Sequence, residues 1–395
     1  MNPYFNQLGR TVLERWQEQN FSLEVFPELA QIALDEAPPC DNVDIAEMIQ
    51  EFLTNDEQPL QGHSGFGQPE LIAFSNPRFY IQILFWMEGT TDIHQHGFSG
   101  AFHVMHGSSV HSEFDFTKKH NITPHIHTGD LSVKTIELLE TGRTVPIASG
   151  KGCIHSLFHL DTPSVTVVVR TQHDPGSDPQ FTYLPPHIAI NPVHEDSLTM
   201  RRKQLIDVLE NIDDQNYVAQ VSEMIRTLDF ERGFHTLHHA MNHLIGLGEW
   251  EAVLAIFQQK HGELATGVSD TLHETLRRET ITQMRHYIDN PEHRFFLALL
   301  MNVQNRKDIL SLVSTRYRDQ PPAETILRWI QELIEPSDYG LTLLDVTFPE
   351  TIDADIDTQF ELLIDTLSKV LEESPTEQPE INKAFINSCL RPLFT

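Results

Sequence analysis

The sequence has few cysteines, few basic residues and no long hydrophobic run. The three cysteines, Cys40, Cys153 and Cys389, lie far apart and are odd in number, so they imply no disulfide framework. Lysine and arginine total 27 against 57 aspartate and glutamate residues, which gives a formal net charge of −30. This excess of acid argues against a nucleic-acid partner, because phosphate binding requires clustered basic side chains.

The chain also lacks the patterns of a membrane or secreted protein. No apolar stretch reaches the roughly 18 residues that a spanning helix needs. The first residues, MNPYFNQLGRTVLERWQEQN, show no basic segment followed by an apolar core, so they do not have the pattern of a secretory signal. We therefore expect a cytoplasmic protein with no membrane partner, and no pattern indicates its oligomeric state.

Hydrophobic periodicity divides the 395 residues into three segments, which is consistent with two or three domains. Residues 1–64 have helical spacing, with Phe5, Leu8, Val12 and Trp16 on one face and an interruption at Pro38-Pro39. Residues 65–192 follow the Gly/Pro-rich stretch GHSGFGQP and have a β pattern. Residues 193–395 are helical again.

The middle segment contains short runs rich in β-branched and aromatic residues, separated by turn residues. The clearest runs are 79–86, 101–106, 110–116, 131–139 and 164–171. About seven strands at this spacing predict an antiparallel barrel or sandwich. The expected fold class is therefore α+β and multidomain: an antiparallel barrel between an N-terminal helical segment and a large all-α domain.

The last segment is expected to contain about eight to ten helices between residues 197 and 392. Leu205, Val208, Leu209 and Ile212 share one helical face. Pro322 stands at a plausible first position of the helix that includes AETILRWIQELIE, and Pro336 follows its end.

Histidine is the residue type that stands out, with 22 in the chain. On an extended segment alternate side chains share a face, so His94 and His96 are expected to point the same way. His155, on a later strand, is the candidate third ligand. Three imidazoles on one face leave coordination positions open for substrate and oxygen, and they suit several first-row metals.

These residues fall in two motifs that resemble those of the cupin superfamily. The first family motif is a glycine, His-x-His, a glutamate and a glycine; this chain has Gly89, His94-Gln95-His96, Gly100 and Gly107. The opening gap is one residue short, and Gly100 stands where the family has its glutamate ligand. The second motif keeps Gly152 and His155, with Gly150 in place of proline and His159 in place of asparagine.

A missing glutamate is typical of three-histidine cupins, such as the cysteine dioxygenase-like thiol dioxygenases. The resemblance, over about residues 65–190, implies Fe(II) held by His94, His96 and His155; the same ligands also accept zinc, nickel, copper or manganese. It implies a small-molecule substrate, together with O₂, as partners. The Gly100 position is then expected to leave a coordination position open, although a glycine that relieves a tight barrel strand explains it equally.

The chain departs from that family where the substrate is bound. Where amino-acid thiol dioxygenases use an arginine to hold the substrate carboxylate, this chain has Glu70, and the nearest arginine, Arg78, falls in an expected turn. The family's Ser-x-His-x-Tyr relay is reduced to the hydroxyl of Thr166. We assign candidate catalytic roles to His159, as a residue that orients a ligand, and to Arg170, as an anion-binding residue.

Other residues offer competing interpretations. Lys151 is a second candidate for anion binding, and Cys153 is either a soft ligand or a small buried hydrophobe. His103 is a fourth ligand only if its strand bulges, since alternation from Gly100 puts it on the opposite face. Two further groups of histidines are candidates for other metal sites: His125 with His127, in an expected loop, and His235, His239 and His243, on one helical face.

Two functions from different classes fit this pattern. The first is a mononuclear non-haem Fe(II) dioxygenase acting on a small organic substrate, thiol-containing or anionic. The alternative is a non-catalytic, metal-dependent small-molecule sensor whose helical domain provides the output. Fold alone does not choose between them, since cupins support many activities.

Overall fold

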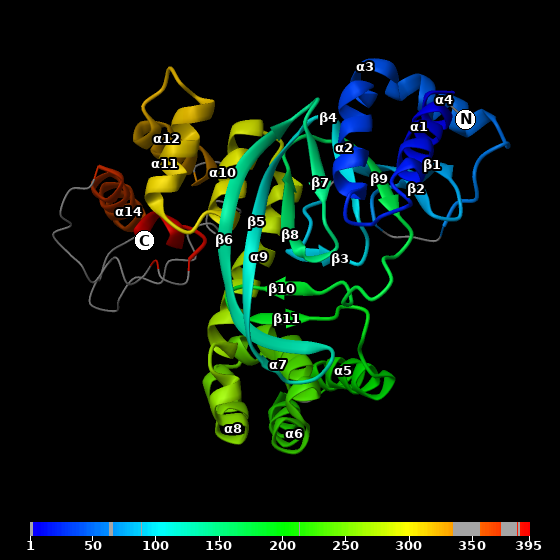
Figure 1. Cartoon of the computed structure of the whole chain (residues 1–395). Coiled ribbons are helices and arrows are strands. Elements are labelled where there is room, and N and C mark those ends of the chain that lie inside the picture. The colour runs from blue at the N-terminus through cyan, green and yellow to red at the C-terminus, as the bar shows by residue number, and fades with distance from the viewer. Residues whose placement is uncertain are drawn as a thin grey trace.

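Two antiparallel β-sheets occupy the middle of the chain, and helices cover them on several sides (Figure 1). The computed structural model describes residues 3–62, 66–87, 89–212, 214–334, 356–372, 385 and 388–395. The predicted fold class is confirmed: a closed antiparallel barrel lies between N-terminal helices and a large C-terminal helical region. In the described residues, no helix is both long enough and apolar enough to cross a membrane.

The N-terminal segment consists of short helices that pack on the outer face of one sheet. They are α1 (Pro3–Glu18), α2 (Phe26–Glu36), α3 (Pro39–Asn42) and α4 (Ile45–Thr54). The predicted apolar face of α1 is confirmed, because Phe5, Leu8, Val12 and Trp16 are all buried. These residues share a hydrophobic core with Phe79 and with strand residues around Val167.

The first sheet has five strands in the order β1 (Glu70–Ser75), β2 (Phe79–Trp86), β9 (Ser164–Thr171), β4 (Gly100–His106) and β7 (Thr144–Ile147). Val165, Val167 and Val169 of β9 face the N-terminal helices, whereas Thr166 and Val168 face the second sheet. Both faces of β9 are covered, and seven of its eight residues are therefore buried.

The second sheet closes on itself as a six-stranded barrel. Its order is β10 (Thr182–Leu184), β11 (Ile188–Ile190), β6 (Ile126–Glu140), β5 (Ser108–Asn121), β8 (Gly150–His159) and β3 (His94–His96). One apolar cluster lies between the two sheets and includes Leu84, Phe102 and Leu157. A second cluster, with Phe114 and Tyr183, is formed by strands of the closed barrel and the loops that precede β3 and β10.

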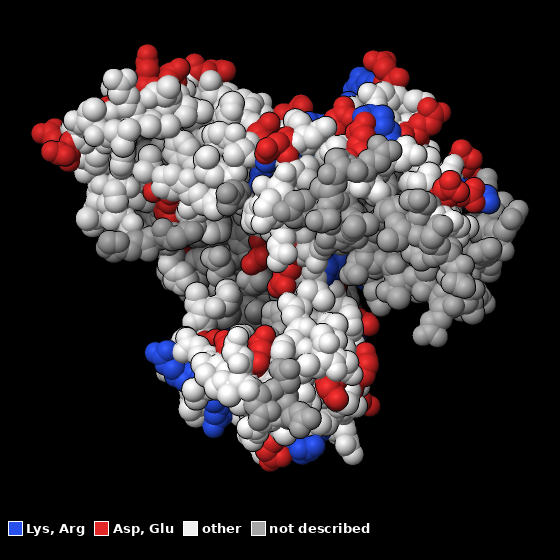
Figure 2. Space-filling model, turned by 180° about the vertical axis from the view of Figure 1, so that it is seen from behind, with Lys and Arg blue, Asp and Glu red and all other residues white. Residues whose placement is uncertain are grey.

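The described part of residues 193–395 is helical, as predicted. Helices α5 (Ser197–Glu210), α6 (Asp214–Thr227), α7 (Phe230–Gly246) and α8 (Trp250–His261) form a lobe below the barrel in Figure 1. Seen from behind, this lobe is set off from the rest of the molecule by a recess, and acidic residues outnumber basic ones on that face (Figure 2).

The remaining helices pack beside the barrel. They are α9 (Val268–Tyr287), α10 (Pro291–Asn302), α11 (Arg306–Arg316), α12 (Pro322–Ile334) and α14 (Ile356–Leu371), with 3₁₀ turns η1 (Gly262–Ala265) and η2 (Arg391–Phe394). Helix α12 begins at Pro322 as expected; Pro336 lies outside the described residues.

The predicted apolar face of α5 is partly wrong as a packing face. Leu205, Val208 and Ile212 are exposed, and the helix buries Thr199 and Ile206 instead. Polar contacts to α7 attach this helix: the Asp207 carboxylate accepts from His239, and further contacts follow along the same pair of helices. Leu209, the fourth residue of the predicted face, is half-buried and packs on the core of the lobe together with Ile206, so the prediction is wrong for only part of that face.

Buried arginines attach α9 and α10 to the end of β8. The Arg285 guanidinium donates to the carbonyl oxygen of His159 at 2.9 Å, and Arg294 donates to the Leu160 carbonyl and to Thr162. Ser156 of β8 donates to the Asn302 side chain at 3.4 Å. The predicted segments 65–192 and 193–395 therefore share buried polar contacts, and their independence as folding units stays a prediction.

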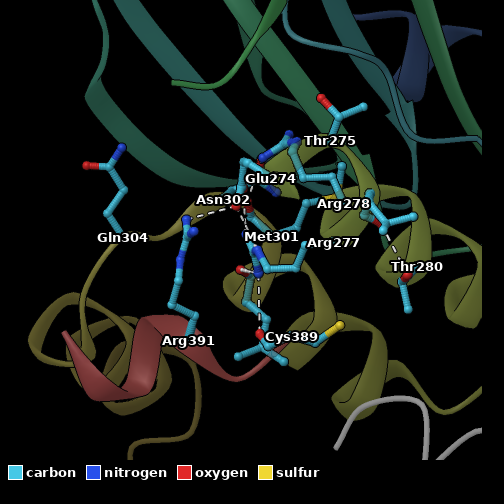
Figure 3. A network of polar contacts seen from close by, with 12 residues as sticks. Glu274, Thr275, Arg277, Arg278, Thr280, Met301, Asn302, Gln304, Cys389 and Arg391 are labelled. Carbon is cyan, nitrogen blue, oxygen red and sulfur yellow. Dashed lines mark hydrogen bonds and ion pairs between the residues drawn. The ribbon is translucent and has the colours of Figure 1, made fainter. Parts of the chain in front are cut away.

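A carboxylate in α9 also holds the end of the chain (Figure 3). Glu274 is buried and accepts two hydrogen bonds from Arg277, at 2.8 and 2.7 Å, and one from Arg391 of η2 at 2.8 Å. Arg277 also donates to the carbonyl oxygens of Leu300 and Cys389. Burial alone would raise the pKa of Glu274, but the arginines more than offset it and hold that pKa below its usual range.

We predict that Glu274→Gln lowers the free energy of unfolding by about 3–5 kcal/mol at neutral pH, because two guanidinium groups lose their shared counter-charge. A group with a depressed folded pKa stabilises above its unfolded pKa and stops doing so as pH falls through the folded value. The difference between variant and wild type should therefore be constant from pH 7 to about 5 and shrink on further acidification. Urea titrations measure it, with Glu251→Gln, at an exposed glutamate of α8, as control; equal losses in both variants would contradict the account.

Candidate metal centre

Three buried histidines converge between the two sheets. His94 and His96 lie on β3 and His155 on β8, and the antiparallel register places His94 directly opposite His155. Gln95, between the two β3 histidines, points the other way and accepts a hydrogen bond from Tyr183. The alternation expected for His-x-His on an extended segment is therefore present, and each histidine is at most 5% exposed.

The nitrogen atoms are close enough to share one ion. One ring nitrogen from each of the three residues lies within 4.8 Å of the others, and the Nε2 atoms of His96 and His155 are 2.9 Å apart. Two imidazole nitrogens bound at about 2.1 Å to one ion, roughly at a right angle, are separated by about 3.0 Å. In the described residues this is the one group of three or more such side chains with this spacing.

The hydrogen bond that His94 makes through Nδ1 leaves its Nε2 atom available to bind an ion. Its Nδ1–H donates to the carbonyl oxygen of Asp92 at 2.7 Å, since a carbonyl only accepts. The Nε2 atom therefore carries a lone pair, and it is buried without a protein partner. A buried acceptor with no donor is costly in an apolar surrounding, and a bound cation would remove that cost.

The third histidine is connected to a fourth one that the sequence analysis missed. The Nδ1 atom of His155 is 3.0 Å from Nε2 of His111 on β5, and Nδ1 of His111 is 3.4 Å from a carboxylate oxygen of Glu137 on β6. Glu137 also pairs with Arg143 at 3.5 Å. No motif marks His111; its place on β5, two residues from Ser109 and Glu113, depends on strand pairing that the sequence does not show.

Burial keeps the three candidate ligands neutral. It is the main cause that lowers the pKa of His94, and it lowers the pKa values of His96 and His155 well below their usual range, with the neighbouring imidazoles adding to the shift. A neutral imidazole is the form that binds a metal. Metal binding near neutral pH therefore does not require these imidazoles to lose a proton.

The space beside the histidines is small and mostly apolar. A cavity of about 40 Å³ is lined by aromatic and aliphatic side chains from both sheets, including Phe66, Trp86, Phe98 and Phe102. This volume has room for roughly three water-sized molecules. Polar groups on the wall other than the three histidines are few, and one of them, the Thr166 hydroxyl, already accepts from the Trp86 indole at 3.2 Å.

Arg170 lies close to this cavity. Its guanidinium carbon is 3.3 Å from the centroid of the Phe98 ring, and that ring is 4.4 Å from the His96 ring. Burial lowers the pKa of Arg170, and its positive charge contributes to the lowered pKa of His96. Arg170 is not among the residues that line the cavity, and its N–H groups donate to the carbonyl oxygens of Thr171 and Gln172, so a direct contact with an anion stays a prediction. Lys151 is exposed and lies near Phe116.

His159 is fully buried behind the wall of the cavity rather than on it. Its ring stacks on Trp86 at 4.7 Å between centroids, and Nδ1 is 2.9 Å from the Ser109 hydroxyl. Burial lowers its pKa to about 3, and Nε2 has no protein partner. In this position His159 supports Trp86; a direct contact with substrate stays a prediction.

Two other candidates lie elsewhere. His103 faces the N-terminal helices, as alternation from Gly100 implied, and contacts Thr144 and Cys40. Cys153 is buried in the apolar cluster between the sheets, and burial raises its pKa to about 12, so it is a small hydrophobe rather than a thiolate.

The further histidine groups do not form a three-residue cluster within the described part of the chain. The expected loop at 125–127 is partly wrong, because β6 begins at Ile126 and includes His127; the histidine before it stacks on His194. In the helical stripe, His239 contacts Asp207 at 2.5 Å and His243 contacts Glu210 at 3.2 Å. These contacts join α7 to α5.

The family's arginine and glutamate positions have local explanations. Arg78 lies in the turn between β1 and β2, as expected, and covers Phe21 on the outside of the sheets. At Gly100 a Cβ atom would overlap the carbonyl oxygen of Val169 and come within 2.9 Å of the Cα of Arg170. The close approach of β9 therefore bears out the second expected reason for this glycine, a tight strand, and an open ligand position stays a prediction.

The comparisons with known proteins leave the chain without a family. It matches no family model and no curated protein. Among solved structures it is similar to the capsular polysaccharide assembling protein CapF from Staphylococcus aureus, at 17% sequence identity over 39% of this chain and 43% of that chain. The TM-score of 0.23 is too low to establish a shared fold.

We predict that Gly100→Ala lowers the free energy of unfolding by about 1–3 kcal/mol, the usual range for overpacking, because β9 would have to move away from β4. Thermal or urea unfolding measures this change. Gly142→Ala is a less crowded comparison, because no atom lies within 4 Å of a Cβ there, although its positive φ of 94° adds strain of its own. A Gly100→Ala protein as stable as the wild type would show that the two strands are further apart than described.

Proposed function

We propose that the barrel binds one divalent metal ion through His94, His96 and His155. The observation that carries this proposal is that one ring nitrogen from each of the three buried histidines lies within 4.8 Å of the others, while Nε2 of His94 is buried without a protein partner. Three neutral imidazoles in an apolar surrounding fit such an ion, and the fixed orientation of two of the rings lowers the cost of assembling the site.

Fe(II) is the ion we propose first, and the cupin superfamily is the family. The support is the resemblance of the two histidine motifs together with a barrel of the expected strand type. Zinc, nickel, copper and manganese have compatible ligand preferences. Bound there, Fe(II) would supply open coordination positions for dioxygen and a substrate.

The activity we propose is that of a dioxygenase acting on a small anionic substrate. The cavity of about 40 Å³ restricts the size of what enters without movement of the wall. Arg170, held against Phe98, offers a positive charge for a carboxylate or thiolate, and the aromatic side chains exclude water.

A metal-dependent sensor is the second candidate, favoured by one specific observation. The strand that carries His155, β8, is hydrogen-bonded to both helices of the C-terminal region that pack beside it. Ser156, next to His155, donates to α10, and the carbonyl oxygen of His159 accepts from α9. A shift of β8 on ligand binding would therefore displace α9 and α10 through these hydrogen bonds. Turnover with O₂ separates the two candidates, because a sensor binds the ion and ligand without consuming oxygen.

We predict that His96→Ala lowers the affinity for Co²⁺ or Zn²⁺ at least 100-fold, because one of three ligands is lost, while His103→Ala changes it less than threefold. Both residues are buried histidines, His96 on the closed barrel and His103 on the five-stranded sheet, so the pair separates ligation from packing. Competition titration with a chromophoric chelator measures the affinities. Equal losses in both variants would contradict the ligand assignment.

We predict that Arg170→Met weakens azide binding to the Co²⁺-loaded protein about tenfold, because the positive charge beside the anion is removed. Visible absorption of Co²⁺ follows the titration. Arg78→Met is the matched control, since Arg78 also stacks on a phenylalanine but lies outside the sheets. Unchanged azide affinity in Arg170→Met, with Co²⁺ still bound, would remove Arg170 from the site.

A further inference from the structure

His155 differs from the other two candidate ligands in what lies behind it. His94 is held by a main-chain carbonyl, and the Nδ1 atom of His96 is buried without a protein partner. Behind His155 a row of side chains leads from the cavity toward the surface: His111, fully buried, and then Glu137, whose side chain is 42% exposed. The surface end is completed by Arg143.

We propose that His111 and Glu137 are positioning residues, which hold His155 in the tautomer that has its proton on Nδ1 and its lone pair on Nε2. This inference rests on the proposed metal centre, since the lone pair so placed is the one directed at His96 and the ion. It adds two residues that neither histidine motif contains.

The carboxylate of Glu137, at the surface end of the row, determines which nitrogen atoms of His111 and His155 donate and which accept. An ionised carboxylate only accepts, so the nitrogen of His111 that faces Glu137 must carry a proton. With a single proton on its ring, His111 has none on Nε2, and this atom accepts from the Nδ1–H of His155; a doubly protonated His111 would instead donate to Nδ1 of His155 and leave the His155 proton on Nε2. In the opposite arrangement a bare Nδ1 of His111 would face the carboxylate oxygens at 3.4 Å, which is repulsive.

The surroundings keep this arrangement in place. The hydrogen bond from His111 is the main cause that lowers the pKa of Glu137, and Arg143 adds to it, so the carboxylate stays ionised and accepting. The His111 ring is fully buried and meets the edge of Phe102 at 6.0 Å between centroids. With its rotation restricted, it presents Nε2 to His155 without an entropic cost at the moment of metal binding.

The consequence for the ion is a better third ligand. Hydrogen bonding of Nδ1–H to an acceptor raises the basicity of the opposite nitrogen and fixes the plane of the ring, and loss of such a partner commonly costs 10–100-fold in metal affinity. In a variant without the acceptor, His155 would be free to place its proton on Nε2, where it competes with the ion.

The direct test is the tautomer of His155 in the metal-free protein, read from long-range ¹⁵N–¹H correlations of the imidazole rings. The wild type should show a protonated Nδ1 and a bare Nε2, and His111→Phe should show a mixture. His111→Gln restores an acceptor and should return the wild-type pattern. A wild-type His155 with its proton on Nε2 would overturn the proposal, whether or not the protein binds a metal.

The second arm measures Co²⁺ affinity at neutral pH. His111→Phe should bind 10–100-fold more weakly than wild type, and His111→Gln within about threefold of it. His103→Phe is the matched control, because it also replaces a fully buried strand histidine, on the five-stranded sheet. Unchanged affinity in a folded His111→Phe would contradict the role, whereas failure of the wild type to bind Co²⁺ would count against the metal centre instead.

A third variant keeps the test decisive if His111→Phe fails to fold. Glu137 is partly exposed, so Glu137→Ala should fold and should bind Co²⁺ about tenfold more weakly, because His111 loses the acceptor that orients it. Glu113→Ala is its control: Glu113 lies on the neighbouring strand and pairs with Lys134 rather than with a histidine. Equal affinity in the two glutamate variants would overturn the proposal.

Discussion

The pairing of β3 with β8 is the constraint on which the site depends. Only three residues long, β3 has His94 opposite His155, and an irregularity in the register between Gln95 and His96 accompanies the close approach of the His96 and His155 rings. Strand β8 is fixed on its other side by β5, which brings His111 behind His155. A slip of β3 by one residue in this register would turn His94 and His96 to the face opposite His155.

Burying the polar imidazole nitrogens away from water costs free energy, and the packing of the surrounding structure offsets this cost. Three imidazoles and four indole or phenyl rings line a space with little room for solvent, and Nε2 of His94 and Nδ1 of His96 are buried there without protein partners. The apolar clusters on either side of β8 and β9 hold these groups in place, as do the buried arginines of α9 and α10. The helical region is thus part of what keeps the candidate ligands together, which is why a sensor role deserves a test beside catalysis.

Sequence reasoning reached the parts of this structure that depend on local pattern. Alternation on an extended segment placed His94 and His96 on one face and His103 on the other, and the valine-rich run 164–171 was recognised as a strand. It missed His111 and Glu137, since a residue behind a ligand is defined by strand pairing over long separations and has no local signature. Helix α5 shows the same limit, because its packing on α7 combines Ile206 and Leu209 with the contact between Asp207 and His239, and Leu205 and Val208 are left exposed.

Gly100 illustrates how a motif position carries two physical meanings at once. The missing side chain allows β4 to approach β9 closely, and it also removes the carboxylate that related motifs use as a ligand. The sequence shows a glycine at this position, but only the backbone distance shows that no side chain fits.

The central claim is that three imidazoles hold one ion, and X-ray absorption at the metal edge tests it most directly. Protein produced with iron available and purified without chelators should show a first shell with nitrogen at about 2.0–2.2 Å and the outer-shell scattering of three imidazole rings. A first shell of oxygen alone, a sulfur ligand at about 2.3 Å, or protein that retains no metal under these conditions would contradict the account.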